Sequence, residues 1–215
     1  IKLRPLGMGH INTTWEVELL GGAATGQQRF VLQKVNRSVF SEPAELMANL
    51  DQLFTSKVVT NSTVLNYVLP QPLPTSSGAL LVNSGTEMLS DGQIVDCQWR
   101  LAAFIEDGRT LQSLSNTRQA EAAGRAFGDF QLWLESLESV SLVEVIPGFH
   151  QLDGYLQALR RAASSANVGG DPYAARERLL LGQLQTRDYL RAAQPVGVAN
   201  GVIHGDCKVN NLLFA

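Results

Sequence analysis

The side chains best suited to chemistry lie near the end of the chain, in the segment HGDCKVNN at residues 204–211. Asp206 follows His204 by two residues, and Asn211 follows Asp206 by five. In phosphoryl transfer an aspartate can accept the proton of the attacking hydroxyl group, while an asparagine a short loop away can hold magnesium against the phosphates. A tight loop between two strands would bring both side chains to one side of a cleft. A polar turn that only satisfies its own backbone is the alternative interpretation of this segment.

Gly7 and Gly9, near the start of the chain, form a second candidate site. A turn with this spacing lets backbone N–H groups approach phosphate oxygens without obstruction by side chains. Taken alone, such a pair is more often an ordinary turn, and Asn12 stands where a nucleotide-binding loop often has a third glycine. The order along the chain is more specific. The turn precedes Lys34 at the end of an apolar segment, then an acidic helix, then the 204–211 segment, as these parts are ordered in kinases.

The elements that must position these residues divide the chain into a β-rich front and a helical back. Apolar patterns predict strands at residues 15–19, 30–35, 64–69, 79–82, 98–105, 202–203 and 212–214. The first two, separated by glycines, predict an antiparallel hairpin, and the last two predict a short hairpin around the 204–211 segment. Helices are predicted at residues 43–54, 116–137, 154–163 and 173–192.

Local signals support two of these helices. Pro43 suits the first position of a helix, and Asn116 is a suitable N-cap with Gln119 three residues later. Gly124 and Gly128 would weaken the helix after Asn116, so we expect another backbone to pack closely against them.

Composition and element order exclude several classes of protein. The 215 residues are 45% hydrophobic and 17% charged, which is typical of a folded chain. Strands that cluster early favour an α+β fold over a doubly wound parallel sheet. The net charge of −3 argues against a nucleic-acid partner, and no apolar run approaches the roughly 20 residues that cross a membrane. The two cysteines, Cys97 and Cys207, favour a reducing, cytoplasmic location.

Together these features resemble the aminoglycoside phosphotransferase and choline kinase superfamily and, within it, the N-acetylhexosamine 1-kinases. The HGDxKxxN element at 204–211 is specific to the superfamily, although Cys207 replaces a threonine that is common there. The narrower likeness rests on LQKVNxxVF at 32–40 and on Phe149 with His150. The other matching residues are Gly7, Gly9, His10, Ile11, Asn12, Thr14, Pro43, Leu46, Met47, Asn49, Trp99, Arg100, Phe104, Ile105, Glu106 and Pro147.

The resemblance implies a protein-kinase-like fold with two lobes and with ATP and Mg²⁺ as cofactors. Residues 1–105 would form a nucleotide-binding N-lobe of sheet and one helix. Residues 106–215 would begin a mainly helical C-lobe and end at the catalytic loop. Because the sequence starts at Ile1 and stops in the apolar run 212–215, we expect a longer protein whose second magnesium-binding aspartate lies beyond residue 215.

The resemblance also implies roles for single residues. Asp206 would be the catalytic base, Asn211 a magnesium ligand and His204 a residue that orders the loop. The other nucleotide contacts would be Gly7, Gly9 and Asn12 at the phosphates, and Phe104, Ile105 and Glu106 at the adenine.

Lys34 is expected to bind the α- and β-phosphates, with Glu45 as its partner on the following helix. Gln33 is an alternative to Lys34 because the strand register is unknown, and Glu42 is an alternative to Glu45. Arg100, beside Trp99, is interpreted as a structural residue.

The expected substrate is a small molecule with a hydroxyl group, and the anomeric hydroxyl of an N-acetylhexosamine is favoured. Aminoglycosides, choline and amino-acid hydroxyls are alternative acceptors. Aminoglycosides call for an acidic pocket and choline for an anionic or aromatic one, and the helical part offers no dense acidic run. A catalytically silent nucleotide-binding module is the alternative from a different class.

Overall fold

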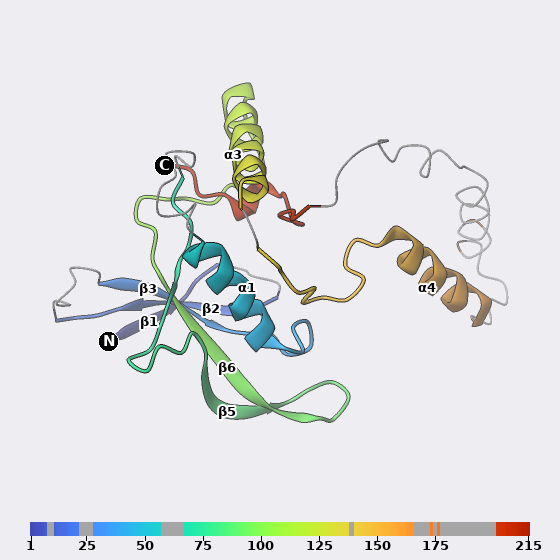
Figure 1. Ribbon diagram of the computed structural model, residues 1–215, viewed down its shortest axis with the longest axis horizontal. Coiled ribbons are helices and arrows are strands. Elements are labelled where there is room, and N and C mark those ends of the chain that lie inside the picture. Colours follow the sequence, from blue (N-terminus) through green and yellow to red (C-terminus); the bar gives the residue numbers. More distant parts are fainter. Residues whose placement is uncertain are drawn as a thin grey trace. The chain divides into compact units, whose positions relative to one another are not determined.

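The computed structural model describes residues 1–7, 11–21, 28–56, 67–137, 140–165, 173, 176 and 201–215. Contacts divide the chain into two compact units, one of residues 1–146 and 202–215 and the other of residues 147–201. The larger unit combines an antiparallel sheet with helices, as Figure 1 shows, and the predicted α+β class is confirmed. Among the described residues, no helix has the length and apolar character that crossing a membrane requires.

One antiparallel sheet forms the front of the larger unit. Its strands within the described residues are β1 (Lys2–Pro5), β2 (Thr13–Glu18), β3 (Arg29–Lys34), β4 (Pro72–Leu73), β5 (Val82–Met88) and β6 (Ile94–Ala103). The order is β1-β2-β3-β6-β4, and β5 also pairs with β6. The predicted hairpin is confirmed as β2 and β3, in which Trp15 lies opposite Leu32. β6 is ten residues long and pairs with β3, β4 and β5, so it joins the hairpin to the rest of the sheet.

The strand predicted at 79–82 is wrong in position, because β5 begins only at Val82 and continues to Met88. Ala79 instead closes a turn, since its carbonyl accepts a hydrogen bond of 2.8 Å from the Thr75 N–H. β5 has the polar sequence VNSGTEM and exposes most of its side chains, so no apolar pattern reveals it. Pairing with β6 explains its formation, and a tight turn with Gly92 at φ +88° joins the two strands.

Two further strand predictions have other outcomes. Residues 64–66 lie outside the described residues, and 67–69 do not form a strand. The predicted final hairpin is wrong, because 202–203 is not a strand. Phe214 pairs instead with Arg109, through two backbone hydrogen bonds of 3.0 and 2.9 Å.

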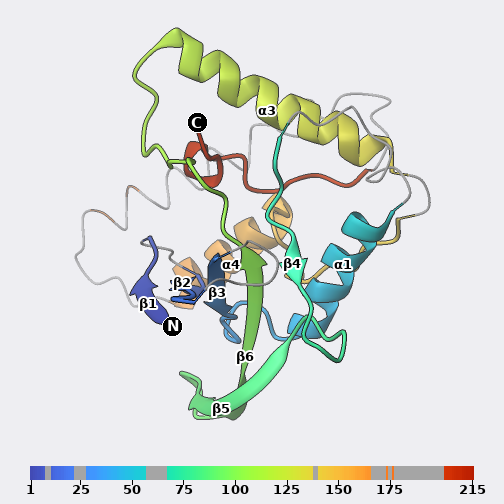
Figure 2. The same ribbon diagram turned by 90° about the vertical axis from the view of Figure 1, so that its left-hand side faces the viewer.

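The helix predicted after Pro43 is confirmed as α1 (Pro43–Thr55), with the proline in its first turn. Figures 1 and 2 show α1 against one side of the sheet, where Met47 is 3% exposed. Asn49 is also buried and exchanges two hydrogen bonds with the backbone of Val143, of 2.8 and 3.0 Å. A buried amide needs such partners, and these fix α1 to the segment after the next long helix.

That next helix is α3 (Thr117–Glu135), and its predicted cap is confirmed. The Asn116 side chain accepts a hydrogen bond of 2.9 Å from the Gln119 N–H. The buried face of α3 includes Trp133, which is 1% exposed. The expectation of a close backbone at Gly124 and Gly128 is wrong for the described residues, because both are exposed and nothing there lies within 4 Å of an added Cβ.

The smaller unit contains α4 (Leu152–Ser165), which confirms the helix predicted at 154–163. The helix predicted at 173–192 lies outside the described residues except for Tyr173 and Arg176, which are helical. Ahead of α4, His150 has a positive φ of 60°, and its N–H donates a 3.0 Å hydrogen bond to the Tyr155 hydroxyl.

Candidate active site

The 204–211 segment forms a compact loop in which the predicted catalytic side chains meet. The Asn211 Nδ2 donates to the Asp206 carboxylate at 3.0 Å and to the Asp206 carbonyl at 2.8 Å. Residues Val209–Asn211 form a single 3₁₀ turn, η1, which brings the asparagine back to the aspartate. The structure therefore places the predicted base and the predicted magnesium ligand side by side.

His204 orders the start of this loop. Its Nδ1 accepts the Asp206 N–H at 3.2 Å, and its ring lies edge-on to Phe127 and Phe130 of α3, with ring centres 5.4 Å apart in each pair. Gln131, also on α3, donates a 2.9 Å hydrogen bond to the Val202 carbonyl. Figure 2 shows this last segment of the chain, in red, running beside α3. The α3 side chains Phe127, Phe130 and Gln131 thus support the loop.

The far end of the loop is tied to the segment that follows β6. The bridge between Arg109 and Phe214 holds the two backbones together. Gly108 lies so close to Leu213 that an added Cβ would approach the Leu213 Cβ to 3.0 Å. A larger residue at position 108 would push this contact apart, so the close packing explains why a glycine stands there.

The electrostatic surroundings keep Asp206 ionised. Lys208 forms an ion pair of 2.9 Å with its carboxylate, and this hydrogen bond is the main reason that the pKa of Asp206 lies below its ordinary value. Burial acts in the opposite direction, and the Asn211 amide lowers the pKa further. The carboxylate is therefore charged at neutral pH and able to accept a proton or face a cation.

Magnesium fits the donors of this loop. Asp206 and Asn211 supply carboxylate and amide oxygens, which magnesium prefers, and it commonly completes its shell with water and phosphate oxygens. Among the described residues, no group of three or more His, Cys, Asp or Glu side chains gathers as a dedicated metal cage.

The glycine turn is described only in part. Gly7 has φ +69°, a conformation that glycine adopts without strain, whereas Gly9 lies outside the described residues. Asn12 accepts a 3.0 Å hydrogen bond from the Asn36 N–H, and the Asn36 side chain donates to the Ile11 carbonyl at 3.0 Å. Asn12 and Asn36 therefore fasten the end of the turn to the chain leaving β3.

The structure does not bring Lys34 and Glu45 together. Lys34 forms an ion pair of 2.5 Å with Glu87 of β5, and this hydrogen bond is the main reason that the pKa of Lys34 is raised. Glu45 and its alternative Glu42 are exposed at the start of α1. Gln33, the alternative to Lys34, lies opposite Arg100 on β6 and accepts a 2.9 Å hydrogen bond from it.

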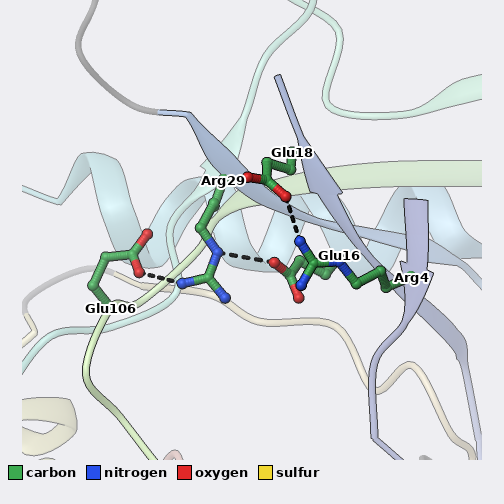
Figure 3. A network of polar contacts seen from close by, with 5 residues as sticks. All are labelled: Arg4, Glu16, Glu18, Arg29 and Glu106. Carbon is green, nitrogen blue, oxygen red and sulfur yellow. Dashed lines mark hydrogen bonds and ion pairs between the residues drawn. The ribbon is translucent and has the colours of Figure 1, made fainter. Parts of the chain in front are cut away.

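The predicted adenine-binding segment is held by Arg29, which the sequence did not single out. The Arg29 guanidinium donates to the Glu16 carboxylate at 2.9 Å and pairs with Glu106, as Figure 3 shows. It also lies over the Phe104 ring, 3.8 Å from the centroid. Phe104 and Ile105 are half-buried. Because 77 residues separate Arg29 from Glu106, no local pattern reveals their contact.

An antiparallel sheet and an Asp–Asn loop supported by a helix are parts that kinase-type phosphotransferases contain. The model of the phosphotransferase enzyme family, the aminoglycoside phosphotransferase and choline kinase superfamily, matches residues 2–215. The chain belongs to this family, whose members act on small-molecule substrates. The predicted superfamily is thus confirmed.

Proposed function

We propose that the protein transfers the γ-phosphoryl group of ATP to a small-molecule hydroxyl group, with the anomeric hydroxyl of an N-acetylhexosamine as the favoured acceptor. The observation that carries the proposal is the contact of 3.0 Å between the Asn211 amide and the ionised Asp206 carboxylate. Phosphoryl transfer to an alcohol uses such a pair, because one residue takes the hydroxyl proton while the other offers an oxygen to magnesium.

The proposed reaction is a single in-line displacement. The acceptor oxygen forms a bond to the γ-phosphorus while the bond from that phosphorus to ADP breaks, and the acceptor proton passes to Asp206. The Asp206 side chain is 46% exposed, so a bound hydroxyl can reach it. Magnesium, when bound with help from Asn211, offsets charge on the phosphates.

The nucleotide is proposed to lie between the glycine turn and the segment after β6. Gly7, Gly9 and Asn12 would surround the phosphates, and Phe104 and Ile105 would contact the adenine. The positive φ of Gly7 and the hydrogen bond that fastens Asn12 support the first assignment. The contact between Arg29 and Phe104 supports the second, because it holds the segment in place.

A neutral sugar is favoured over cationic acceptors because the described acidic side chains of α3 already have partners. Glu121 pairs with Arg125 at 3.0 Å, and Asp129 accepts a 3.1 Å hydrogen bond from the Tyr67 hydroxyl. Glu135 accepts one of 3.3 Å from Gln131. A sugar needs only a few directed hydrogen bonds, whereas an aminoglycoside needs several unpaired carboxylates.

A cytoplasmic location is part of the proposal. Cys97 is buried and Cys207 is exposed, and both are free thiols. Reducing compartments keep such thiols unpaired.

The acceptor is tested with the full-length protein, ATP and magnesium. N-acetylglucosamine, N-acetylgalactosamine, galactose, choline and kanamycin are offered in turn, ADP release measures turnover, and phosphorus NMR locates the transferred phosphate. We expect turnover with a hexose and a phosphate on its anomeric oxygen. Turnover confined to choline or kanamycin would overturn the sugar assignment and leave the kinase assignment intact. ATP binding without turnover of any acceptor would indicate a silent nucleotide-binding module.

A further inference from the structure

The end of β3 presents different side chains to the two faces of the sheet. Gln33 and Lys34 are neighbours in a strand, so their side chains point to opposite faces. Lys34 is on the face where Glu87 neutralises it at 2.5 Å. Gln33 is on the face that also carries Arg100, and there Met47 of α1 lies against the Arg100 guanidinium. The helix side of the sheet therefore carries Gln33, not Lys34.

Three polar side chains form a connected row across this face. Thr14 lies opposite Gln33, and Gln33 lies opposite Arg100. The Gln33 Nε2 donates to the Thr14 Oγ1 at 3.0 Å, and its Oε1 accepts from the Arg100 Nε at 2.9 Å. Gln33 thus uses both ends of its amide and fixes the guanidinium orientation. Since Thr14 is two residues beyond Asn12, the row begins beside the glycine turn.

Arg100 is a half-buried cation without a charged counterpart among the described residues. Besides Gln33, it contacts the Met47 sulfur at 3.9 Å, which is a weak acceptor. Burial alone lowers the pKa of Arg100, with no carboxylate raising it. An arginine stays protonated in such a place, so its charge is poorly solvated and an anion would compensate it.

The other arginines on this face differ from Arg100 because they have carboxylate partners. Arg29 has two carboxylate partners, Glu16 and Glu106, and Arg4 has Glu18. Those two arginines are matched within the protein. Arg100 has no carboxylate partner among the described residues, so the guanidinium N–H groups that do not contact Gln33 or Met47 can bind a ligand.

We infer that Arg100, rather than Lys34, supplies the cation that binds the nucleotide phosphates, and that Gln33 positions its guanidinium. This inference rests on the proposed function, because it assumes that a nucleotide occupies the site beside the glycine turn. A guanidinium suits the role because its planar N–H groups bind phosphate oxygens in pairs. The triphosphate would supply the anion that the protein does not.

The test compares ATP with adenosine, which has no phosphate, by calorimetric titration of the full-length protein. Arg100→Gln should weaken ATP binding on the order of ten- to hundredfold and leave adenosine binding unchanged, because only the phosphate contacts are lost. Arg100→Lys keeps the charge and should lie between the two. Lys34→Gln should change ATP affinity by less than about threefold, since Lys34 is on the other face.

Arg125→Gln is the matched control, because Arg125 is an exposed arginine of α3 that pairs with Glu121. Circular dichroism checks that each variant is folded, and Arg100→Lys replaces Arg100→Gln if the latter does not fold. Loss of ATP affinity in Lys34→Gln but not in the Arg100 variants would overturn the inference. Equal loss of ATP and adenosine in Arg100→Gln would also overturn it, because it would indicate a purely structural residue. A wild-type protein that binds neither probe would overturn the proposed function itself.

Discussion

Two clusters of polar side chains lie on the same face of the sheet, towards opposite ends of β3, and their charges are balanced differently. The closed cluster consists of Arg4, Glu16, Glu18, Arg29 and Glu106, in which each arginine has a carboxylate partner. Figure 3 shows Arg29 bridging two acidic side chains. The open cluster consists of Thr14, Gln33 and Arg100, in which the only charge belongs to the arginine.

The difference separates groups that hold the fold from groups that are proposed to hold a ligand. A charge that is matched within the protein is already satisfied and adds rigidity. A half-buried charge without a counterion costs stability, and binding an anion recovers it. The Asp206 carboxylate differs from both clusters, because it is half-exposed and has a lysine partner that solvent can replace.

The largest effect on activity is expected at Asp206, because its exposed charge has a chemical role and contributes little to the fold. Asp206→Asn keeps the shape of the side chain and removes its negative charge. We expect kcat to fall on the order of 10²–10⁴-fold, the usual contribution of a general base, while ATP binding survives. Steady-state kinetics and calorimetry on the same preparation check both parts. A near-normal kcat would falsify the assignment of Asp206 as the base.

Breaking the closed cluster should affect stability first. Arg29→Met removes both carboxylate contacts and the contact with the Phe104 ring. Because about a third of this side chain is exposed, solvent screening limits the expected loss to about 1–2 kcal/mol, or about 2–8 °C in Tm. Differential scanning calorimetry measures it against Arg125→Met, which should change Tm less. An unchanged Tm for Arg29→Met would show that the cluster does not stabilise the fold.

Acidification should weaken the same cluster. The hydrogen bond from Arg29 is the main cause that lowers the pKa of Glu16 from its ordinary 4.5. A lowered pKa in the folded state contributes stability that is present above 4.5 and is lost as the pH falls below it. The Tm of the wild type should therefore decrease more steeply below this pH than the Tm of Arg29→Met. Parallel curves for the two proteins would contradict the assignment.

A smaller effect on activity is expected at Lys208, which influences the pKa of the proposed base Asp206 but does not itself accept the proton. Its hydrogen bond lowers the pKa of Asp206, so Lys208→Gln should raise that pKa. Since the base must be ionised, the acid limb of kcat/KM should move to higher pH. Lys208→Arg retains the positive charge and should keep the limb in place. If the acid limb does not move in Lys208→Gln, the pH dependence of kcat/KM does not report the ionisation of Asp206.

The sequence was sufficient to predict features whose signals lie within a few neighbouring residues. The Asn116 cap, the proline at the start of α1 and the Asp206–Asn211 spacing each depend on residues within one turn or loop. The prediction made from the glycines of α3 was wrong, because no described atom lies within 4 Å of a Cβ added at Gly124 or Gly128.

Features that depend on distant partners could not be predicted. β5 has no apolar alternation and forms because β6 offers it a partner. One residue of register decides which side of the sheet Gln33 and Lys34 occupy, since a shift of one exchanges their faces. The register is set by pairing with β2 and β6, and Glu87, the partner of Lys34, lies 53 residues from it in the chain. Only the folded sheet shows which side chain is neutralised.

One titration tests most directly the central claim that the 204–211 loop, with Asp206 and Asn211, forms a site for the magnesium complex of a nucleotide. The full-length protein is titrated with ATP in magnesium and again in EDTA, with adenosine as the reference ligand. We predict that ATP binds at least about tenfold more weakly in EDTA, a difference of about 1.4 kcal/mol, while adenosine binding does not change. Equal affinity for ATP in both buffers would contradict the role of Asn211 and the account built on it.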